Sequence, residues 1–206
     1  MSFSEPCALA VDFGGTSIKM GVTAGDRILA TADRIPTAMF ESPQAIIEAM
    51  IAAALNLRGQ FPSACVMGMG MPGWCDYYRG TLYQLTNVRV WDHEVPVKEL
   101  MEQALGLPVV LDNDANCMAY AEWKLGAGRG MSSLVCLTMG TGIGGGIVGN
   151  DRIPRFPPGS WARRASITRA SPARSATGEP LKNTSATTNW RRRRSNGMPG
   201  RESSKP

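Results

Sequence analysis

The first part of the chain alternates short apolar runs with turn residues. Residues 7–13 (CALAVDF), 18–24 (IKMGVTA) and 26–35 (DRILATADRI) have the length and apolar content of strands. Two glycines at 14–15 and the sequence Ala-Gly-Asp at 24–26 lie between them, and both are typical of turns. The pattern therefore predicts an antiparallel meander of three strands.

Helical and extended patterns alternate after the meander. Ser42-Pro43 is a typical helix start, and Gly59 is the predicted end of the first helix. The predicted elements are, in order, a helix over 44–59, a buried strand over 63–73 that leads into a Pro-Gly turn, a helix over 95–106, a strand over 107–114, a helix over 115–128, and a strand, glycine turn and strand over 132–150.

The order of elements restarts at residue 107, which predicts two related α/β halves with a boundary near Pro108. We expect an N-terminal domain over 1–108, the start of a second domain over 109–152, and a tail over 153–206. The seam between two such halves is a usual place for a ligand.

The periodic pattern stops after Asn150, and the charge changes there as well. Residues 1–150 carry 9 Lys and Arg against 14 Asp and Glu, a net charge of −5. Residues 151–206 carry 13 against 3, a net charge of +10, and they are rich in Ser, Thr and Pro. This composition predicts disorder in the tail, and the overall charge of +5 says nothing about partners of the main body.

Composition narrows the expected setting of the protein. The chain has 206 residues and is 43% hydrophobic, but no apolar run reaches the roughly 18 residues of a membrane span. No basic segment followed by a long apolar run marks a secretory signal at the N-terminus. Five cysteines without a CxxC spacing predict reduced thiols in a cytoplasmic protein. With a single histidine, His93, a histidine-built metal site is not expected.

A glycine turn at the end of the first strand is the first candidate for chemistry. Glycines such as Gly14 and Gly15 let backbone N–H groups approach a phosphate without interference from a Cβ atom. Thr16 supplies a hydroxyl donor, Lys19 a positive charge, and Asp12 a carboxylate suited to a hydrated Mg²⁺. The alternative is an ordinary hairpin with a Gly-Gly turn.

A second glycine turn lies within 138–148 (TMGTGIGGGIV), between two apolar strands. Thr141 and the Gly142 amide are candidate phosphate donors, and the alternative is a hairpin whose backbones pack closely. The spacing is not that of a Walker P-loop. A dinucleotide-binding site is also excluded, because no ribose-binding acid follows about 20 residues later in a βαβ unit.

Two further segments place polar residues at strand ends. Asp112 and Asp114 lie where a strand gives way to a helix, so that one carboxylate is a candidate general base; the alternative is helix capping by Asp or Asn. Pro72-Gly73 and Asn87 are candidates for a polar pocket that takes hydroxyl groups, although Pro-Gly alone is also a common turn.

Taken together, the segments resemble the ROK family of bacterial sugar kinases, especially its glucokinase-like members. The resemblance covers about residues 7–150 and rests on DFGGTSIKMGV, GMGMPG, TNVRVW, VPVKELMEQALGLPV, LDNDANCMAYAEW and LTMGTGIGGGIV. It implies the α/β actin-like ATPase (ribonuclease H-like) fold, with two α/β domains around a cleft and the second domain incomplete in this chain.

The resemblance also implies roles for individual residues. The DFGGT segment would form the first phosphate loop and GTGIGG the second, and the two would bind ATP with Mg²⁺. Asp114 would be the catalytic base that takes a proton from the attacking sugar hydroxyl. Asn113 and Asn87 would hydrogen-bond sugar hydroxyls, and Gly73 would line the same pocket. The expected partners are therefore a sugar and ATP, and members of the family commonly form homodimers.

The chain departs from the family after the second glycine turn. The family's G-x-x-G-x-A-G-E-x-G-H segment and its zinc-binding cysteine cluster are missing, since no cysteine follows Cys136 and no histidine follows His93. We therefore expect no zinc and an incomplete sugar site. The abrupt change in composition suggests out-of-frame translation from about Ile153 onward, and the coding DNA across that point tests this hypothesis.

Three functions are weighed on these grounds. The first is a hexose kinase, with glucose as the leading substrate, N-acetylmannosamine or another N-acetylhexosamine as the next, and impaired turnover in this chain. The second is a non-catalytic remnant of such a kinase. The third, nucleic-acid binding through the four arginines at 191–194, is disfavoured, because a flexible basic tail is more often incidental than a binding site.

Overall fold

The computed structural model describes residues 6–85, 88–139 and 143–155. All of them belong to the unit Met1–Ala170. Among the helices of these ranges, none combines the length and the apolar composition that a membrane crossing requires.

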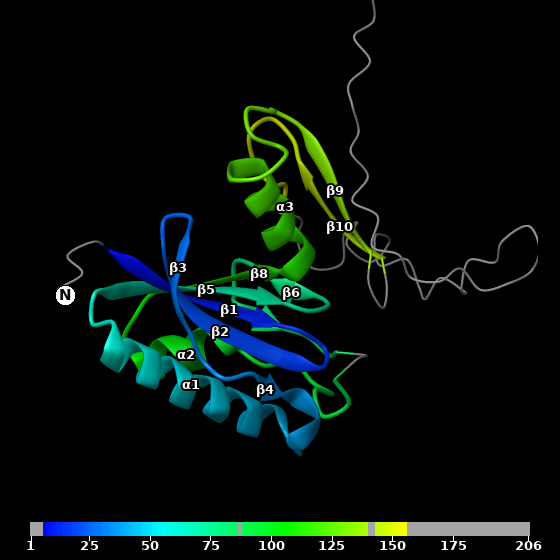
Figure 1. Ribbon diagram of the computed structural model, residues 1–206. Helices are drawn as coiled ribbons and strands as arrows, with labels where there is room; N and C mark the ends of the chain where they lie inside the picture. Colours follow the sequence, from blue (N-terminus) through cyan, green and yellow to red (C-terminus); the bar gives the residue numbers. More distant parts are fainter. Residues whose placement is uncertain (1–5, 86–87, 140–142, 156–206) are drawn as a thin grey trace, which may run out of the picture. The chain divides into compact units, whose positions relative to one another are not determined.

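A six-stranded mixed sheet is the main structural element (Figure 1). Its strand order is β3-β2-β1-β5-β8, and β4 pairs with β2 beside this path. The strands are β1 (Cys7–Phe13), β2 (Ser17–Ala24), β3 (Arg27–Thr31), β4 (Ile35–Pro36), β5 (Ala64–Met71) and β8 (Val109–Asn113).

The first three strands form the antiparallel meander that the sequence predicts. The run at 26–35, predicted as one strand, is divided in two. Its first part, β3, pairs with the later half of β2 through Gly21↔Thr31, and its last residues form β4, which pairs with the beginning of β2 through Ile18↔Ile35. The chain between them therefore turns so that both parts remain paired to the same strand.

Strands β5 and β8 are parallel to β1 and to each other, and helices make the required crossovers. Helix α1 (Pro43–Gln60) precedes β5, and helix α2 (Val97–Leu105) precedes β8. The side chain of Ser42 caps α1 by accepting a hydrogen bond from the amide of Ala45. Helix α1 does not stop at Gly59 as predicted: it continues to Gln60, and Phe61 follows as the C-cap with its N–H bonded to the carbonyl of Leu57.

The hydrophobic core lies between the sheet and helices α1 and α2, which lie on the same face (Figure 1). Strand β1 alternates so that Leu9, Val11 and Phe13 are buried, while Asp12 on the opposite side is exposed. Because Asp12 is the last outward position of β1, the sheet presents this carboxylate at the strand end, on the face that the core does not occupy.

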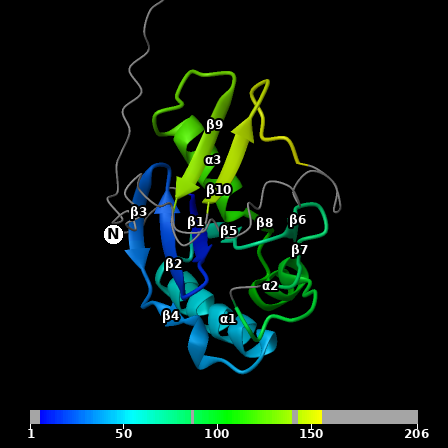
Figure 2. The same ribbon diagram turned by 90° about the vertical axis from the view of Figure 1, so that its right-hand side faces the viewer.

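Helix α3 (Asp114–Lys124) follows β8 without a loop and packs against a two-stranded antiparallel sheet of β9 (Leu134–Met139) and β10 (Ile143–Val148) (Figure 2). A Cβ atom on Gly146 would lie 2.6 Å from the Cβ of Ala119, and one on Gly144 would lie 2.6 Å from Thr138 Oγ1 on β9 and 3.4 Å from the Cβ of Ala115. These two glycines therefore allow close packing on α3, as in the structural alternative considered for this segment.

Three short elements were not predicted: the 3₁₀ turn η1 (Thr37–Met39) and the strands β6 (Cys75–Asp76) and β7 (Thr81–Leu82), which pair with each other. The domain boundaries expected near residues 108 and 152 stay predictions. However, β8 is hydrogen-bonded to β5, so the first sheet continues past Pro108, where a second domain was expected to begin. The sequence could not reveal this, because an apolar strand does not indicate which sheet it joins.

Candidate functional site

Four strands bring polar and small residues into one row across the first sheet. The register pairs Asp12 with Lys19 on β2 and with Gly70 on β5, and it pairs Gly70 with Asp112 on β8. The row lies at the carboxyl ends of the parallel strands β1, β5 and β8, and ligands of open α/β sheets bind outside this edge. The row therefore locates the candidate site.

Asp12 and Lys19 form an ion pair at one end of the row. The Lys19 Nζ atom donates to Asp12 Oδ2 at 2.7 Å, and both side chains are more than half exposed. Water screens such an exposed pair, so the pair adds little to stability. Both groups can therefore exchange partners at small cost, which suits residues that meet a charged ligand.

Thr37 holds the turn between β1 and β2 in place by hydrogen bonds. The sequence did not indicate this residue as part of the site. The Thr37 hydroxyl donates to the carbonyl of Gly15 at 2.8 Å, and the Thr37 amide donates to the carbonyl of Thr16 at 3.1 Å. The amide of Gly14 closes the turn on the carbonyl of Ser17 at 3.0 Å. Both bonds from Thr37 go to carbonyl oxygens of the turn, whereas a phosphate would need its N–H groups.

Asn113 links helix α3 to the turn after β5. Its Oδ1 atom caps the helix by accepting from the amides of Ala115 at 3.0 Å and Asn116 at 3.3 Å. Its Nδ2 group donates to the carbonyl of Gly73 at 2.8 Å. Gly73 has φ +70°, and a Cβ there would lie 2.8 Å from Leu85, so this position requires glycine. Two residues predicted for the sugar pocket thus contact each other.

The two candidate acids beside Asn113 have different surroundings. Asp112 is buried, and its Oδ1 accepts from the amide of Asn113 at 2.8 Å and from Asn116 Nδ2 at 2.9 Å. Its Oδ2 accepts from Arg155 Nε at 3.0 Å. Asp114 is exposed at the first position of α3, where its Oδ1 accepts from the amide of Ala115 at 2.8 Å. Asp114 is therefore the acid that a ligand can reach.

The pKa of the Asp114 carboxyl is raised above its ordinary value, chiefly because neighbouring groups displace water from around it. The hydrogen bond from Ala115 lowers the pKa, while the negative charge of Asp12 raises it further. Two acids 102 positions apart in the sequence are thus close enough to interact electrostatically. A carboxyl with a raised pKa that faces a second carboxylate is typical of functional sites.

Two cysteines, Cys75 and Cys117, lie close enough to Asp112 for its charge to affect their pKa. Burial, together with the charge of Asp112, raises the pKa of the Cys75 thiol to about 12, and the same causes raise that of Cys117 to about 12. Such thiols stay protonated at neutral pH and are poor nucleophiles. A Cβ atom on Gly70 would lie 3.6 Å from Cys117 Sγ, which indicates that α3 packs on the sheet at this point.

The structure brings together Asp12, Lys19, Asn113, Asp114 and Gly73, and it fastens the turn 14–16 beside them. The predicted residues Asn87, Thr141 and Gly142 lie outside the described residues. Within the described ranges, no group of three or more His, Cys, Asp or Glu side chains is arranged to hold a metal ion by itself.

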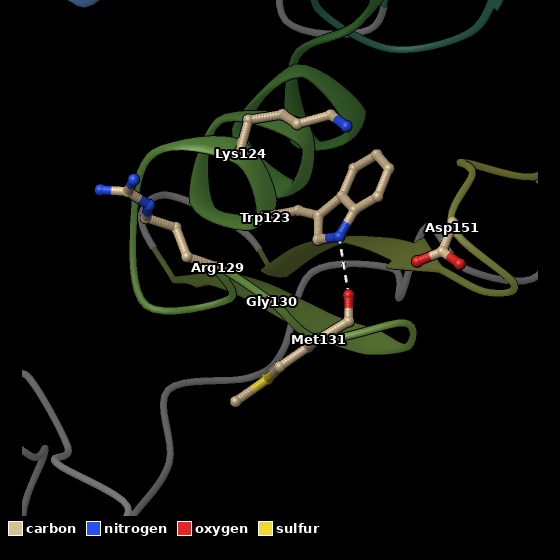
Figure 3. Close-up of a pocket in the computed structure, with 6 residues that line it drawn as sticks. All are labelled: Trp123, Lys124, Arg129, Gly130, Met131 and Asp151. Carbon is tan, nitrogen blue, oxygen red and sulfur yellow. Dashed lines mark hydrogen bonds between the residues drawn. The ribbon is translucent and has the colours of Figure 1, made fainter.

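An open cavity of about 310 Å³ lies elsewhere, at the far end of α3 (Figure 3). Trp123 lines it, donating from Nε1 to the carbonyl of Met131 at 2.7 Å, and the Lys124 Nζ lies 3.6 Å from the centre of the indole ring. Helix α3 has 11 residues, so its two ends are roughly 16 Å apart. This cavity is therefore separate from the site around Asp114.

Comparison with known proteins gives a family match and similar enzymes. The sequence profile of the ROK family matches residues 8–159. A glucokinase of Streptomyces coelicolor is 37% identical over 147 residues, covering 71% of this chain and 45% of that enzyme. A β-glucoside kinase of Listeria monocytogenes is 36% identical over 148 residues, covering 71% of this chain and 48% of that enzyme.

Among solved structures, a ROK family glucokinase of Streptomyces griseus in complex with glucose and AMPPNP has a TM-score of 0.64 and 36% identity. The match covers 73% of this chain and 47% of that one. It confirms the predicted fold class, the actin-like ATPase fold of ROK sugar kinases. The chain spans about half the length of the relatives that it matches.

Proposed function

The chain belongs to the ROK family, and from this premise we propose that it takes part in ATP-dependent phosphorylation of a hexose, with glucose as the leading substrate. The observation that carries the proposal is the position of Asp114: exposed, within electrostatic range of Asp12, and next to the bonded pair Asn113 and Gly73. Relatives named glucokinase and β-glucoside kinase support the reaction class.

Asp114 is the proposed general base. Phosphoryl transfer needs little covalent assistance, so the protein contributes mainly by positioning the acceptor and stabilising charge. A carboxylate with a raised pKa accepts a proton from a sugar hydroxyl more readily than an ordinary aspartate does. The start of α3 fixes the direction of the Asp114 side chain, because Asn113 caps the same helix turn from which Asp114 projects.

The turn 14–16 is the proposed contact for the phosphates. The two hydrogen bonds from Thr37 go to carbonyl groups of the turn, so they use none of the N–H groups that a phosphate would require, whereas the Gly14 N–H is already bonded to the carbonyl of Ser17. Lys19 lies on the adjacent strand and supplies a positive charge that can turn from Asp12 to a phosphate oxygen. Glycine at position 14 avoids a tight contact, because a Cβ there would lie 3.0 Å from the carbonyl oxygen of Ser17.

The site fits a nucleotide-bound Mg²⁺ at Asp12. Mg²⁺ in kinase sites usually keeps several waters and binds one or two carboxylates together with the substrate phosphates. The exposed carboxylate of Asp12 at the end of β1 offers this single oxygen ligand. When bound, the ion would neutralise phosphate charge during transfer.

Glucose-dependent release of ADP tests the proposal. We expect the full chain to release ADP only when ATP and a hexose are both present. Asp114→Asn should reduce this release to background, because general-base assistance contributes about 10²–10⁴-fold. Asp26→Asn, which changes an exposed aspartate in the turn between β2 and β3, is the matched control and should leave the rate unchanged. Equal rates above background for the wild type and Asp114→Asn would overturn the assignment of Asp114, and a wild type at background would overturn the proposed activity of this chain.

A further inference from the structure

We propose that Arg155 is a positioning residue for the site: its guanidinium, stacked on Tyr77, compensates the buried carboxylate of Asp112 and thereby fixes the start of α3, from which Asn113 and Asp114 project. The functional meaning of this placement rests on the proposed function, whereas the placement itself is independent of it. Arg155 lies in the segment for which the composition suggests out-of-frame translation, so the proposal concerns the contacts of this residue in the chain as it stands, whatever its origin. No motif in the sequence indicates that residue 155 meets residues 77 and 112.

Asp112 is the centre of the arrangement. Its side chain is only 11% exposed, so the free-energy cost of removing its charge from water must be offset by partners. Three donors serve it: the amide of Asn113, the Nδ2 group of Asn116 and the Nε group of Arg155. The first two come from the beginning of α3, and only Arg155 brings a full positive charge.

Arg155 reaches Asp112 from a separate part of the chain. It follows β10, after the bridge between Gly149 and Arg152. Its guanidinium carbon lies 3.7 Å from the centre of the Tyr77 ring, close enough for a cation–π contact. Its side chain is 28% exposed, so the pair with Asp112 is screened less than a surface pair. The guanidinium of Arg155 therefore contacts side chains from two other segments of the chain, those of Asp112 and Tyr77.

The geometry predicts what happens when the cation is lost. An uncompensated buried carboxylate draws water or rotates toward the surface, because the desolvated charge is no longer balanced. Either response breaks the bonds from Asn113 and Asn116 to Asp112, which hold the first turn of α3. The side chain of Asn113 would then lose its fixed direction toward Gly73, and Asp114 would lose its place.

The alternative is that Arg155 only holds the chain after β10 against the rest of the protein and has no specific effect on the site. The two possibilities differ in what they do to α3. An anchor stabilises the fold as a whole, and its loss lowers the melting temperature without a specific effect on Asn113 or Asn116. A positioning residue also controls the side-chain amides of those two asparagines, and NMR observes these groups directly.

The test is NMR of the full chain without substrates, comparing Arg155→Gln with the matched control Arg152→Gln. Arg152 is an exposed arginine three residues earlier in the same segment. We expect Arg155→Gln to speed exchange of the Asn116 and Asn113 side-chain amide protons with water by about tenfold, the loss of one ordinary hydrogen bond. Arg152→Gln should leave both unchanged. Equal effects of the two substitutions would overturn the proposal.

Two further comparisons separate charge from stacking. The double variant Asp112→Asn with Arg155→Gln removes both charges, so we expect slower amide exchange than in Arg155→Gln alone. Exchange as fast in the double variant as in the single one would also overturn the proposal. Tyr77→Phe keeps the ring and should match the wild type, while Tyr77→Leu should speed exchange. If Arg155→Gln does not fold, Arg155→Lys, which keeps the charge, takes its place. The rate of side-chain amide exchange in Arg155→Lys should lie between the rates of the wild type and the double variant.

This experiment separates the inference from the proposed function. Amide exchange is measured without ATP or sugar, so a chain without turnover still answers the question. Where ADP release is measurable, Arg155→Gln should lower kcat more than it raises KM for ATP, because the acceptor side of the site is disturbed. A normal kcat with fast amide exchange would contradict the part of the proposal in which Arg155 positions Asp114, and would leave only its control of the two asparagine amides.

Discussion

Asp112 and Asp114 are two positions apart in the sequence, yet the fold gives them different surroundings. Asp112 is the second-last residue of β8 and is buried next to the start of α3, where backbone, amide and guanidinium donors occupy both of its oxygens. Asp114 begins the helix on the exposed side and keeps a raised pKa. Environment rather than residue type therefore decides which carboxylate is structural and which is available for proton transfer.

The raised pKa of Asp114 leads to a prediction about stability. A carboxyl that holds its proton more tightly in the folded state binds more protons there than in the unfolded chain, so its contribution to stability falls as pH rises between the two pKa values. Above both values, the charge of Asp114 is a net cost. We therefore expect Asp114→Asn to raise the melting temperature at pH 7, even though the proposed function has this substitution reduce turnover.

The size of that gain should depend on pH. Below the ordinary aspartate pKa of about 4, both states hold the proton and the advantage of Asp114→Asn disappears. Melting temperatures of the two proteins across pH 3–7, at fixed ionic strength, measure the effect. A melting temperature that is lower in Asp114→Asn at pH 7 would mean that the carboxylate stabilises the fold, contrary to the direction of its pKa shift.

At the scale of elements, the glycine-rich segment after β9 serves two purposes that the sequence alone did not separate. Gly144 and Gly146 lie within β10, on the side that contacts α3, and their lack of a side chain lets the helix approach. The turn that contains Thr141 and Gly142 lies outside the described residues, so its phosphate contact stays a prediction. Close packing explains part of the motif without any ligand.

Packing at Gly146 leads to a prediction. A methyl group there would lie 2.6 Å from the Cβ of Ala119 and 2.7 Å from the carbonyl of Ala115, so the helix or the strand must shift. We expect Gly146→Ala to destabilise the protein by about 1–3 kcal/mol, as overpacking does. Gly68→Ala on β5 is the control: its Cβ meets nothing within 4 Å, so urea unfolding should show no loss of stability. Equal midpoints for the two variants would contradict the packing argument.

For the whole molecule, local pattern predicted the elements well and long-range contacts poorly. The meander, three helices and the glycine hairpin follow from periodicity and turn residues, because these signals are local. The sequence did not show that β8 joins the first sheet, since strand pairing depends on distant partners. Thr37 and Arg155 were missed for the same reason: each reaches its partner only through the folded sheet.

Strands β9 and β10 expose apolar side chains on the side of the hairpin that points away from α3. The residues of β9 that point away from α3 are Val135, Leu137 and Met139, which are 65%, 68% and 78% exposed. Ile147, opposite Val135 on β10, is 55% exposed. Neither strand contains a charged residue. This row of side chains, here called the outer face of the hairpin, is the kind of surface on which apolar molecules adsorb.

The outer face should therefore bind an uncharged apolar dye such as Nile red. We expect Leu137→Lys to reduce dye fluorescence, because a charge at the centre of the row divides it. Stability should change by no more than about 0.5 kcal/mol, since the side chain is exposed. Ile28→Lys on β3 is the matched control: Ile28 is exposed to a similar degree but lies outside the row, so its replacement should change fluorescence less. Unchanged dye binding in Leu137→Lys would show that the dye binds elsewhere and that the outer face does not act as one apolar surface.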